Sequence, residues 1–61
     1  MKYSVYKIDV TNQIRTKTLL DTNFKSWKEA EHYRDSYLEY CKLTKYEKVI
    51  IEPKYPSYTY N

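Results

Sequence analysis

The chain contains no glycine among its 61 residues, and this absence limits both its turns and its chemistry. Glycine is the residue that most readily adopts a positive φ angle and that lets a backbone approach a ligand closely. Turns must therefore be built from other residues, and glycine-rich phosphate loops are excluded. The RNP1 motif of RNA-recognition domains needs glycines beside its aromatic residues, so it is excluded as well.

The length of 61 residues predicts one domain, close to the lower limit for independent folding. A single core of this size rarely contributes more than about 3–5 kcal/mol of stability. Cys41 is the only cysteine and His32 the only histidine, so the chain has no partners for an internal disulfide or a Cys/His zinc site. Association with a second chain is the remaining common reinforcement, and we expect a homodimer.

The single cysteine also bears on the compartment, because cysteine-poor chains without an export signal are typical of the reducing cytoplasm. No segment approaches the roughly 20 consecutive apolar residues of a membrane span, so no membrane location is expected. The net charge is +3, with most of the excess in residues 1–17. This excess is mild compared with the basic tails that bind nucleic acid outright.

Two segments alternate apolar and polar side chains with period two and predict a β-hairpin. They span residues 2–10 and 14–22. A three-residue loop places Val10 opposite Ile14 and keeps the apolar side chains together, whereas a two-residue turn places Val10 opposite Arg15. We therefore predict a loop of residues 11–13, in which an asparagine or a glutamine adopts a positive φ angle.

A helix and a third strand follow the hairpin. Ser26 and Glu29 form a capping-box pattern, and apolar side chains then recur at helical spacing as far as residues 43–44. A glycine-based Schellman ending is not possible here. Residues 46–52 are rich in β-branched side chains and predict a strand, which Pro53 is expected to end.

This order predicts an α+β domain with a two-layer ββαβ arrangement. A right-handed crossover makes the third strand parallel to the second. The simplest three-stranded sheet then has the order 2-1-3 and is mainly antiparallel, with the helix packed on one face. We expect that face to carry Tyr6, Ile8 and Val10. Residues 1–52 form the predicted domain, and residues 53–61 a tyrosine- and proline-rich C-terminal tail.

No residue set predicts catalysis, a cofactor or a metal site. His32 falls on the polar side of the helix, where a solvated histidine is the ordinary interpretation, and Cys41 falls on the apolar side as a buried thiol. Glu31, Asp35 and Glu39 follow one another at helical spacing, but such a convex row offers ligands from one side only. One helix on three strands also encloses no pocket of the size that an enzyme needs.

The uncovered face of the sheet is the predicted contact surface, because apolar and aromatic side chains beside bases mark partner surfaces. In the predicted register Lys7 lies opposite Lys17, and an anionic partner would relieve their repulsion. The predicted partner-binding residues are Tyr3, Val5, Lys7, Arg15, Lys17, Leu19, Tyr46, Lys48 and Ile50.

Two functions fit such a face. The first is a small non-enzymatic protein-binding module, for example an inhibitor or adaptor of phage or mobile-element type, with bases that steer an acidic partner protein. The alternative is binding of single-stranded RNA or DNA, because bases interleaved with aromatic rings on an open sheet are a common platform for single strands. A steep dependence of affinity on salt would identify the alternative.

Overall fold

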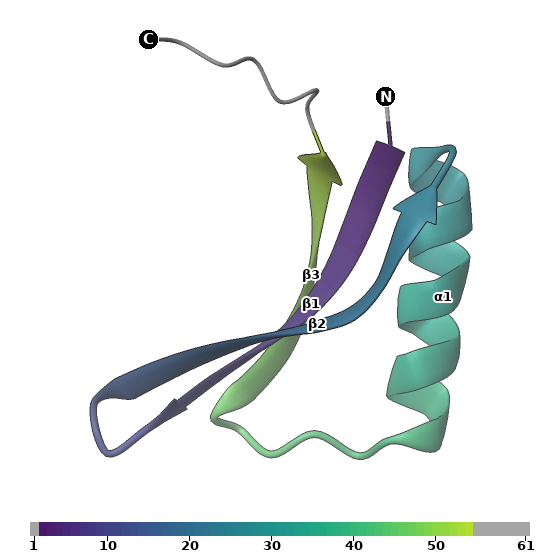
Figure 1. Ribbon diagram of the computed structural model, residues 1–61. Helices are drawn as coiled ribbons and strands as arrows, with labels where there is room; N and C mark the ends of the chain where they lie inside the picture. Colours follow the sequence, from purple (N-terminus) through teal and green to yellow (C-terminus); the bar gives the residue numbers. More distant parts are fainter. Residues whose placement is uncertain (1, 55–61) are drawn as a thin grey trace, which may run out of the picture.

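The computed structural model describes residues 2–54, which form three strands and one helix (Figure 1). The elements are β1 (Lys2–Thr11), β2 (Ile14–Phe24), α1 (Trp27–Tyr40) and β3 (Glu47–Lys54). The sheet has the order β2-β1-β3, and β1 is antiparallel to both neighbours. The predicted two-layer ββαβ fold is confirmed. The predicted tail lies outside the described residues from Tyr55 onward.

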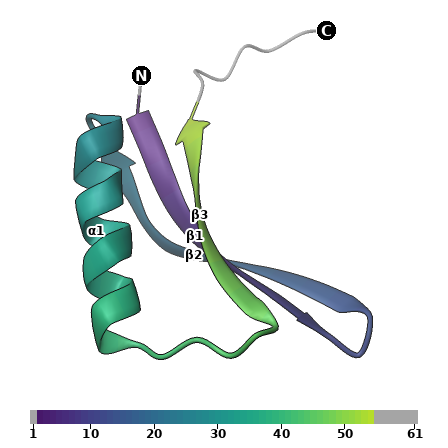
Figure 2. The same ribbon diagram turned by 180° about the vertical axis from the view of Figure 1, so that it is seen from behind.

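The two layers make a thin slab with principal extents of 39 × 29 × 11 Å. The helix lies along one side of the sheet, and the tip of the β1–β2 hairpin projects away from it, as the two opposite views show (Figures 1 and 2). The buried apolar residues of this slab are only Val5, Ile8 and Ala30 among the described residues. A core of this size gives the domain little stability of its own.

The hairpin turn has two residues, so the predicted three-residue loop and its register are wrong. Asn12 and Gln13 both have positive φ angles, 54° and 66°, as a type I′ turn requires. Val10 consequently lies opposite Arg15. A type I′ turn matches the right-handed twist of the two strands, and this local geometry outweighs the grouping of apolar side chains. The one-residue shift moves the side chains of β2 to the other face of the sheet relative to β1.

The second half of β2 is irregular. β1 keeps one continuous register with β3, so the register shifts between β1 and β2 arise from extra residues in β2. One extra residue, Leu20, lies between Leu19 and Asp21, and another lies between Asp21 and Phe24, where Asn23 has a φ angle of 68°. Such bulges bend a strand and increase its twist, which accounts for the curvature of β2 in Figure 1.

The start of α1 is confirmed, but its end is not where the sequence predicted it. The Ser26 hydroxyl accepts a hydrogen bond from the Glu29 N–H at 3.2 Å. The Glu29 carboxylate reaches back to the Lys25 N–H at 2.9 Å, one residue earlier than a capping box places it. The helix ends at Tyr40, because Cys41 already has extended φ and ψ angles. The Cys41 thiol is exposed, so its predicted burial is wrong.

Strand β3 continues through Pro53 to Lys54, and the predicted strand end at residue 52 is therefore wrong. The Val10 N–H donates to the Tyr46 carbonyl at 2.9 Å, and hydrogen-bonded pairs of antiparallel strands recur at every second residue. Pro53 faces Tyr3 at a position between two such pairs. Its backbone nitrogen points away from β1, so proline lacks only an N–H that the sheet does not use.

Candidate functional site

The helix covers the face of the sheet opposite to the one predicted. The Tyr3 ring packs edge-on against Trp27 with ring centroids 5.7 Å apart, and Val5 is fully buried. Val5 lies opposite Ile51 of β3, which supplies a further apolar side chain on this side. The predicted placement of Tyr3 and Val5 on the uncovered face is therefore wrong. The apolarity of a face depends on all three strands, and the alternation within β1 alone does not reveal it.

We call the side of the sheet away from α1 the open face. The register places on it the even-numbered residues of β1 and the residues directly opposite them on β2 and β3. No described element covers this side. The open face comprises Lys2, Ser4, Tyr6, Ile8, Val10, Arg15, Lys17, Leu19, Tyr46, Lys48, Ile50, Glu52 and Lys54.

Six of the nine predicted contact residues lie on this open face. The predicted register of β2 was wrong by one residue, and the helix was predicted on the wrong side of the sheet. Each error alone would move the side chains of β2 to the other face, so the two errors together leave its three predicted contact residues on the open face. The six are Arg15, Lys17, Leu19, Tyr46, Lys48 and Ile50. The sequence reasoning missed Lys2, Tyr6 and Lys54. The period-two pattern does place Lys2 and Tyr6 on one face, but that face was assigned to the core.

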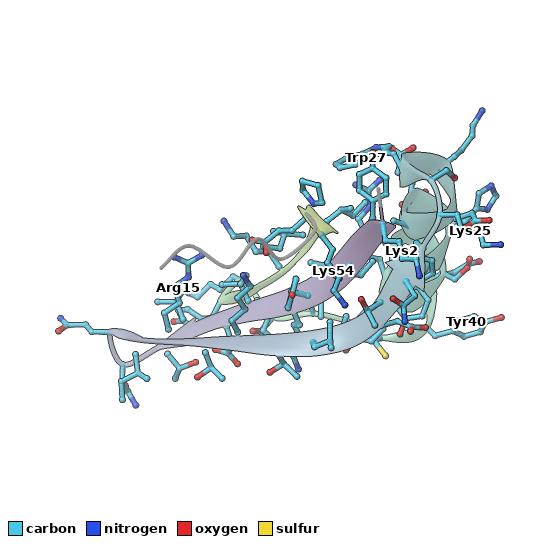
Figure 3. All side chains as sticks on the ribbon, turned by 45° about the horizontal axis from the view of Figure 1, so that its top comes forward. Lys2, Arg15, Lys25, Trp27, Tyr40 and Lys54 are labelled. Atoms are coloured by element: carbon cyan, nitrogen blue, oxygen red, sulfur yellow. The ribbon has the colours of Figure 1, made fainter. Side chains whose placement is uncertain are left out.

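The open face is strongly basic. Five of its charged residues are bases, and Glu52 is the only acid. Lys2 and Lys54 face each other at one end of the sheet, while Arg15 extends from the far hairpin (Figure 3). The other bases are Lys17 and Lys48.

The centre of the open face is occupied by an ammonium group above an aromatic ring. Lys17 Nζ lies 4.3 Å from the centroid of the Tyr6 ring and 2.8 Å from Glu52 Oε1. Lys17 thus links β2 to β3 across β1. A cation–π contact at such a partly exposed site contributes about 0.5–1 kcal/mol. The contact also covers the ring of Tyr6, which is then not a free stacking surface.

A shallow apolar hollow lies toward the hairpin end of the open face. It has a volume of about 230 Å³ and is lined by Ile8, Val10 and Tyr46, together with Lys45, Glu47 and Lys48. The side chains of Val10 and Tyr46 are 44% and 54% exposed, whereas Ile8 is 1% exposed at the bottom. Lys45 Nζ lies 5.2 Å from the Tyr46 ring centroid. The hollow therefore offers apolar contact area beside two lysines and one carboxylate.

Lys7 takes no part in the open face, contrary to its prediction. Its Nζ lies 3.3 Å from Glu47 Oε2 on the helix side, and the hydrogen bond to Glu47, followed by Tyr37, raises the pKa of Lys7. The Thr44 N–H donates to Glu47 Oε1 at 2.9 Å and is the main cause of the lowered pKa of Glu47, followed by Lys7. In the observed register Lys7 faces Thr18, so the predicted repulsion with Lys17 does not arise.

The rest of the described chain carries the exposed Cys41 thiol and ionisable groups that serve the fold. Among residues 2–54 no set of three His, Cys, Asp or Glu side chains could hold a metal ion. Arg34 lies 3.7 Å from Glu31 and 3.1 Å from Asp35, so it partly neutralises the helix carboxylates. Burial raises the pKa of Tyr33, whose hydroxyl donates to the Leu20 carbonyl at 3.5 Å. Tyr33 thus serves the packing of α1 on β2.

Comparisons of the chain with protein-family models, with curated proteins and with solved structures find no match. The described part of the chain holds no helix that is long and apolar enough to cross a membrane. A functional proposal therefore depends on the open face, since it combines exposed apolar side chains with five bases.

Proposed function

We propose that the open face binds an acidic surface of a partner protein, so that the chain acts as a non-enzymatic protein-binding module. The observation that carries this proposal is the coincidence of charge and apolar exposure on one uncovered face. Its five bases stand against one acid, and Val10, Leu19 and Tyr46 are each at least 44% exposed among them. Exposed apolar side chains supply contact area, and bases of one sign steer an acidic partner.

The charges available to such a partner are those that the domain does not use itself. Lys17 is paired with Glu52, whereas Lys2, Arg15, Lys48 and Lys54 make no ion pair within residues 2–54. Lys48 lines the apolar hollow, and Arg15 lies opposite Val10, another of its lining residues. A partner loop with an apolar side chain between carboxylates would match this arrangement, and an inhibitor or adaptor would use such a contact.

Single-stranded nucleic acid is the second candidate, and the same five bases favour it. Recognition of single strands depends on exposed aromatic rings that stack on successive bases. On the open face Lys17 covers Tyr6, so Tyr46 remains as the exposed ring, with Lys45 Nζ 5.2 Å from its centroid. One exposed ring is a poor stacking platform, and this favours the protein partner.

A capture experiment with matched charge reversals tests the proposal. The native chain, the double variant Arg15→Glu/Lys17→Glu and the control Lys28→Glu/Lys42→Glu are immobilised and exposed to one cell lysate. The control removes the same charge from residues that are exposed elsewhere, on α1 and just after it. We expect a protein that binds the native chain and the control but is lost from the open-face variant by at least about tenfold.

A second arm measures the binding of a labelled single-stranded oligonucleotide of about 12 nucleotides at low and at physiological salt. Binding at low salt that falls steeply with added salt, and that the open-face variant abolishes, would establish the second candidate. Equal capture of every bound protein by all three chains would overturn the use of the open face.

We also propose that the chain works as a homodimer in the cytoplasm. The small core, with only three buried apolar residues among those described, supports association with a second chain. The single cysteine supports a location in the reducing cytoplasm. Sedimentation at micromolar concentration tests whether the chain is a dimer.

A further inference from the structure

The outer edge of β3 is an unpartnered strand edge. β3 ends the sheet order β2-β1-β3, so its outer side pairs with no strand of the described residues; the connection from α1 reaches only its first residue, Glu47 (Figures 1 and 2). Its centre, Val49-Ile50-Ile51, is uncharged and only half-buried. An apolar edge strand with unpaired backbone groups is a template for pairing with another strand.

The outward hydrogen-bond donors of this edge are few. Because Val10 and Tyr46 are hydrogen-bonded, the backbone N–H and C=O groups of the even-numbered residues of β3 point toward β1. Those of the odd-numbered residues point outward. Of these, Glu47 already donates its N–H to the Thr44 carbonyl at 3.1 Å, and Pro53 has no N–H. Val49 and Ile51 are therefore the two outward donors of Glu47–Lys54.

We propose that β3 pairs antiparallel with β3 of a second copy about a two-fold axis at Ile50. In this register Val49 donates to the partner's Ile51, and Ile51 donates to the partner's Val49. By symmetry the two copies form about four such hydrogen bonds. Both outward donors of each strand are then satisfied. The two sheets join into one of six strands, with both open faces on the same side.

Charge complementarity selects this register. With the axis at Ile50, Lys48 lies opposite the partner's Glu52, and the reverse pair forms as well; each Glu52 carboxylate also accepts from Lys17 of its own chain. An axis at Val49 places Lys48 opposite the partner's Ile50, and an axis at Ile51 places it opposite the partner's Lys54. Opposite charges facing each other across strands stabilise a sheet, and like charges destabilise it. The axis at Ile50 also sets Val49 against the partner's Ile51 on the helix side.

The other edge of the sheet is unsuitable for a second copy. In the regular part of β2 the backbone N–H and C=O groups of Ile14, Thr16 and Thr18 point toward β1, as the two-residue turn requires. The groups that point outward are those of Arg15, Lys17 and Leu19. Two-fold pairing at this edge would bring Arg15 and Lys17 against the same bases of the partner. Beyond Leu19 the bulges interrupt the edge. The second copy is therefore assigned to β3.

Charge reversal and restoration test the dimer by sedimentation equilibrium over a range of chain concentrations. We expect the native chain to be a dimer at micromolar concentration. Lys48→Glu alone should weaken the dimer about tenfold, because two favourable cross-strand pairs become repulsive. Glu52→Lys alone should weaken it similarly, and the double variant Lys48→Glu/Glu52→Lys should recover most of the loss. Circular dichroism confirms that each variant is folded.

A backbone variant tests the same edge without changing any side chain. In a synthetic chain, N-methylvaline at position 49 removes one outward donor and leaves the bonds to β1 in place. We expect the dimer to dissociate at the concentration where the native chain is dimeric. Lysine methylated on its backbone nitrogen at position 17, on the outward edge of β2, is the matched control and should leave the dimer intact. A native chain that stays monomeric to near-millimolar concentration would overturn the proposal, and so would a dimer that resists the change at position 49.

Discussion

The two faces of the same sheet show how one strand serves two purposes. On the helix side Val5 is fully buried, Tyr3 packs on Trp27, and Lys7 is paired with Glu47. On the open face Val10 of the same strand is 44% exposed. The helix side is internally satisfied, whereas the open face leaves bases and apolar side chains available. Ile8 is also on the open face but is 1% exposed, so the exposed apolar side chains of this face lie around a buried centre.

The contrast extends to how each face uses its charges. On the helix side the Glu47 carboxylate of the Lys7–Glu47 pair is held by a second contact, a hydrogen bond from the Thr44 N–H. The Lys17–Glu52 pair is more than two-fifths exposed on both sides, and exposed pairs of this kind contribute little to stability. The ion pair on the helix side therefore stabilises the fold, whereas the bases of the open face are available to a partner.

The largest expected effect comes from truncating the same side chain on the two faces. Val5→Ala should lower the free energy of unfolding by about 2 kcal/mol, because it removes buried methyl groups and leaves a cavity. Val10→Ala should change it by less than about 0.5 kcal/mol. Urea unfolding followed by circular dichroism measures both. Equal losses at the two positions would remove the distinction between the faces.

A smaller effect is expected at the turn that sets which residues of β2 share the open face. Gln13 has a φ angle of 66°, which glycine adopts without steric cost. Gln13→Gly should raise the free energy of unfolding by about 0.5–1 kcal/mol. Gln13→Ala keeps the steric conflict and serves as the control in the same thermal unfolding measurement. A loss of stability in the glycine variant would contradict the type I′ turn.

The smallest effect concerns the ion pair of the helix side. The pKa of Glu47 is lowered from 4.5, so its contribution to stability is present above pH 4.5 and is lost as the pH falls through the lowered value. We expect Glu47→Gln to reduce the difference in urea midpoint between neutral pH and about pH 3. Glu39→Gln, an exposed helix position without an ion pair among residues 2–54, is the control. An unchanged difference in the Glu47 variant would argue against this coupling.

The order of elements was accessible from the sequence, whereas the assignment of the faces was not. The two period-two segments, the Ser26 cap and the β-branched run at residues 46–52 predict three strands and one helix from local pattern alone, and all four elements are observed. The turn was misjudged because Asn12-Gln13 lacks the glycine that normally marks a two-residue hairpin. The helix side was misjudged because both faces of β1 carry apolar residues.

The candidate site was predicted in part, and for an indirect reason. Arg15, Lys17 and Leu19 lie on the open face because two errors, in register and in helix side, compensate. Tyr3, Val5 and Lys7 belong to β1, so the error in the register of β2 does not affect them. The error in the helix side alone places them on the wrong face. A helix chooses the face where all three strands together offer the better apolar surface, and that sum is not visible within one strand.

The sequence by itself determined the element types, the strand order 2-1-3, the helix start and the absence of glycine-dependent motifs, because these follow from local pattern and chain connectivity. Only the tertiary structure decided the turn type, the bulges of β2, the position of Pro53 in β3 and the identity of the covered face. These depend on backbone twist and on packing between segments far apart in the chain. A residue pattern constrains each segment separately, whereas the packing of helix on sheet depends on the combined surface of all three strands.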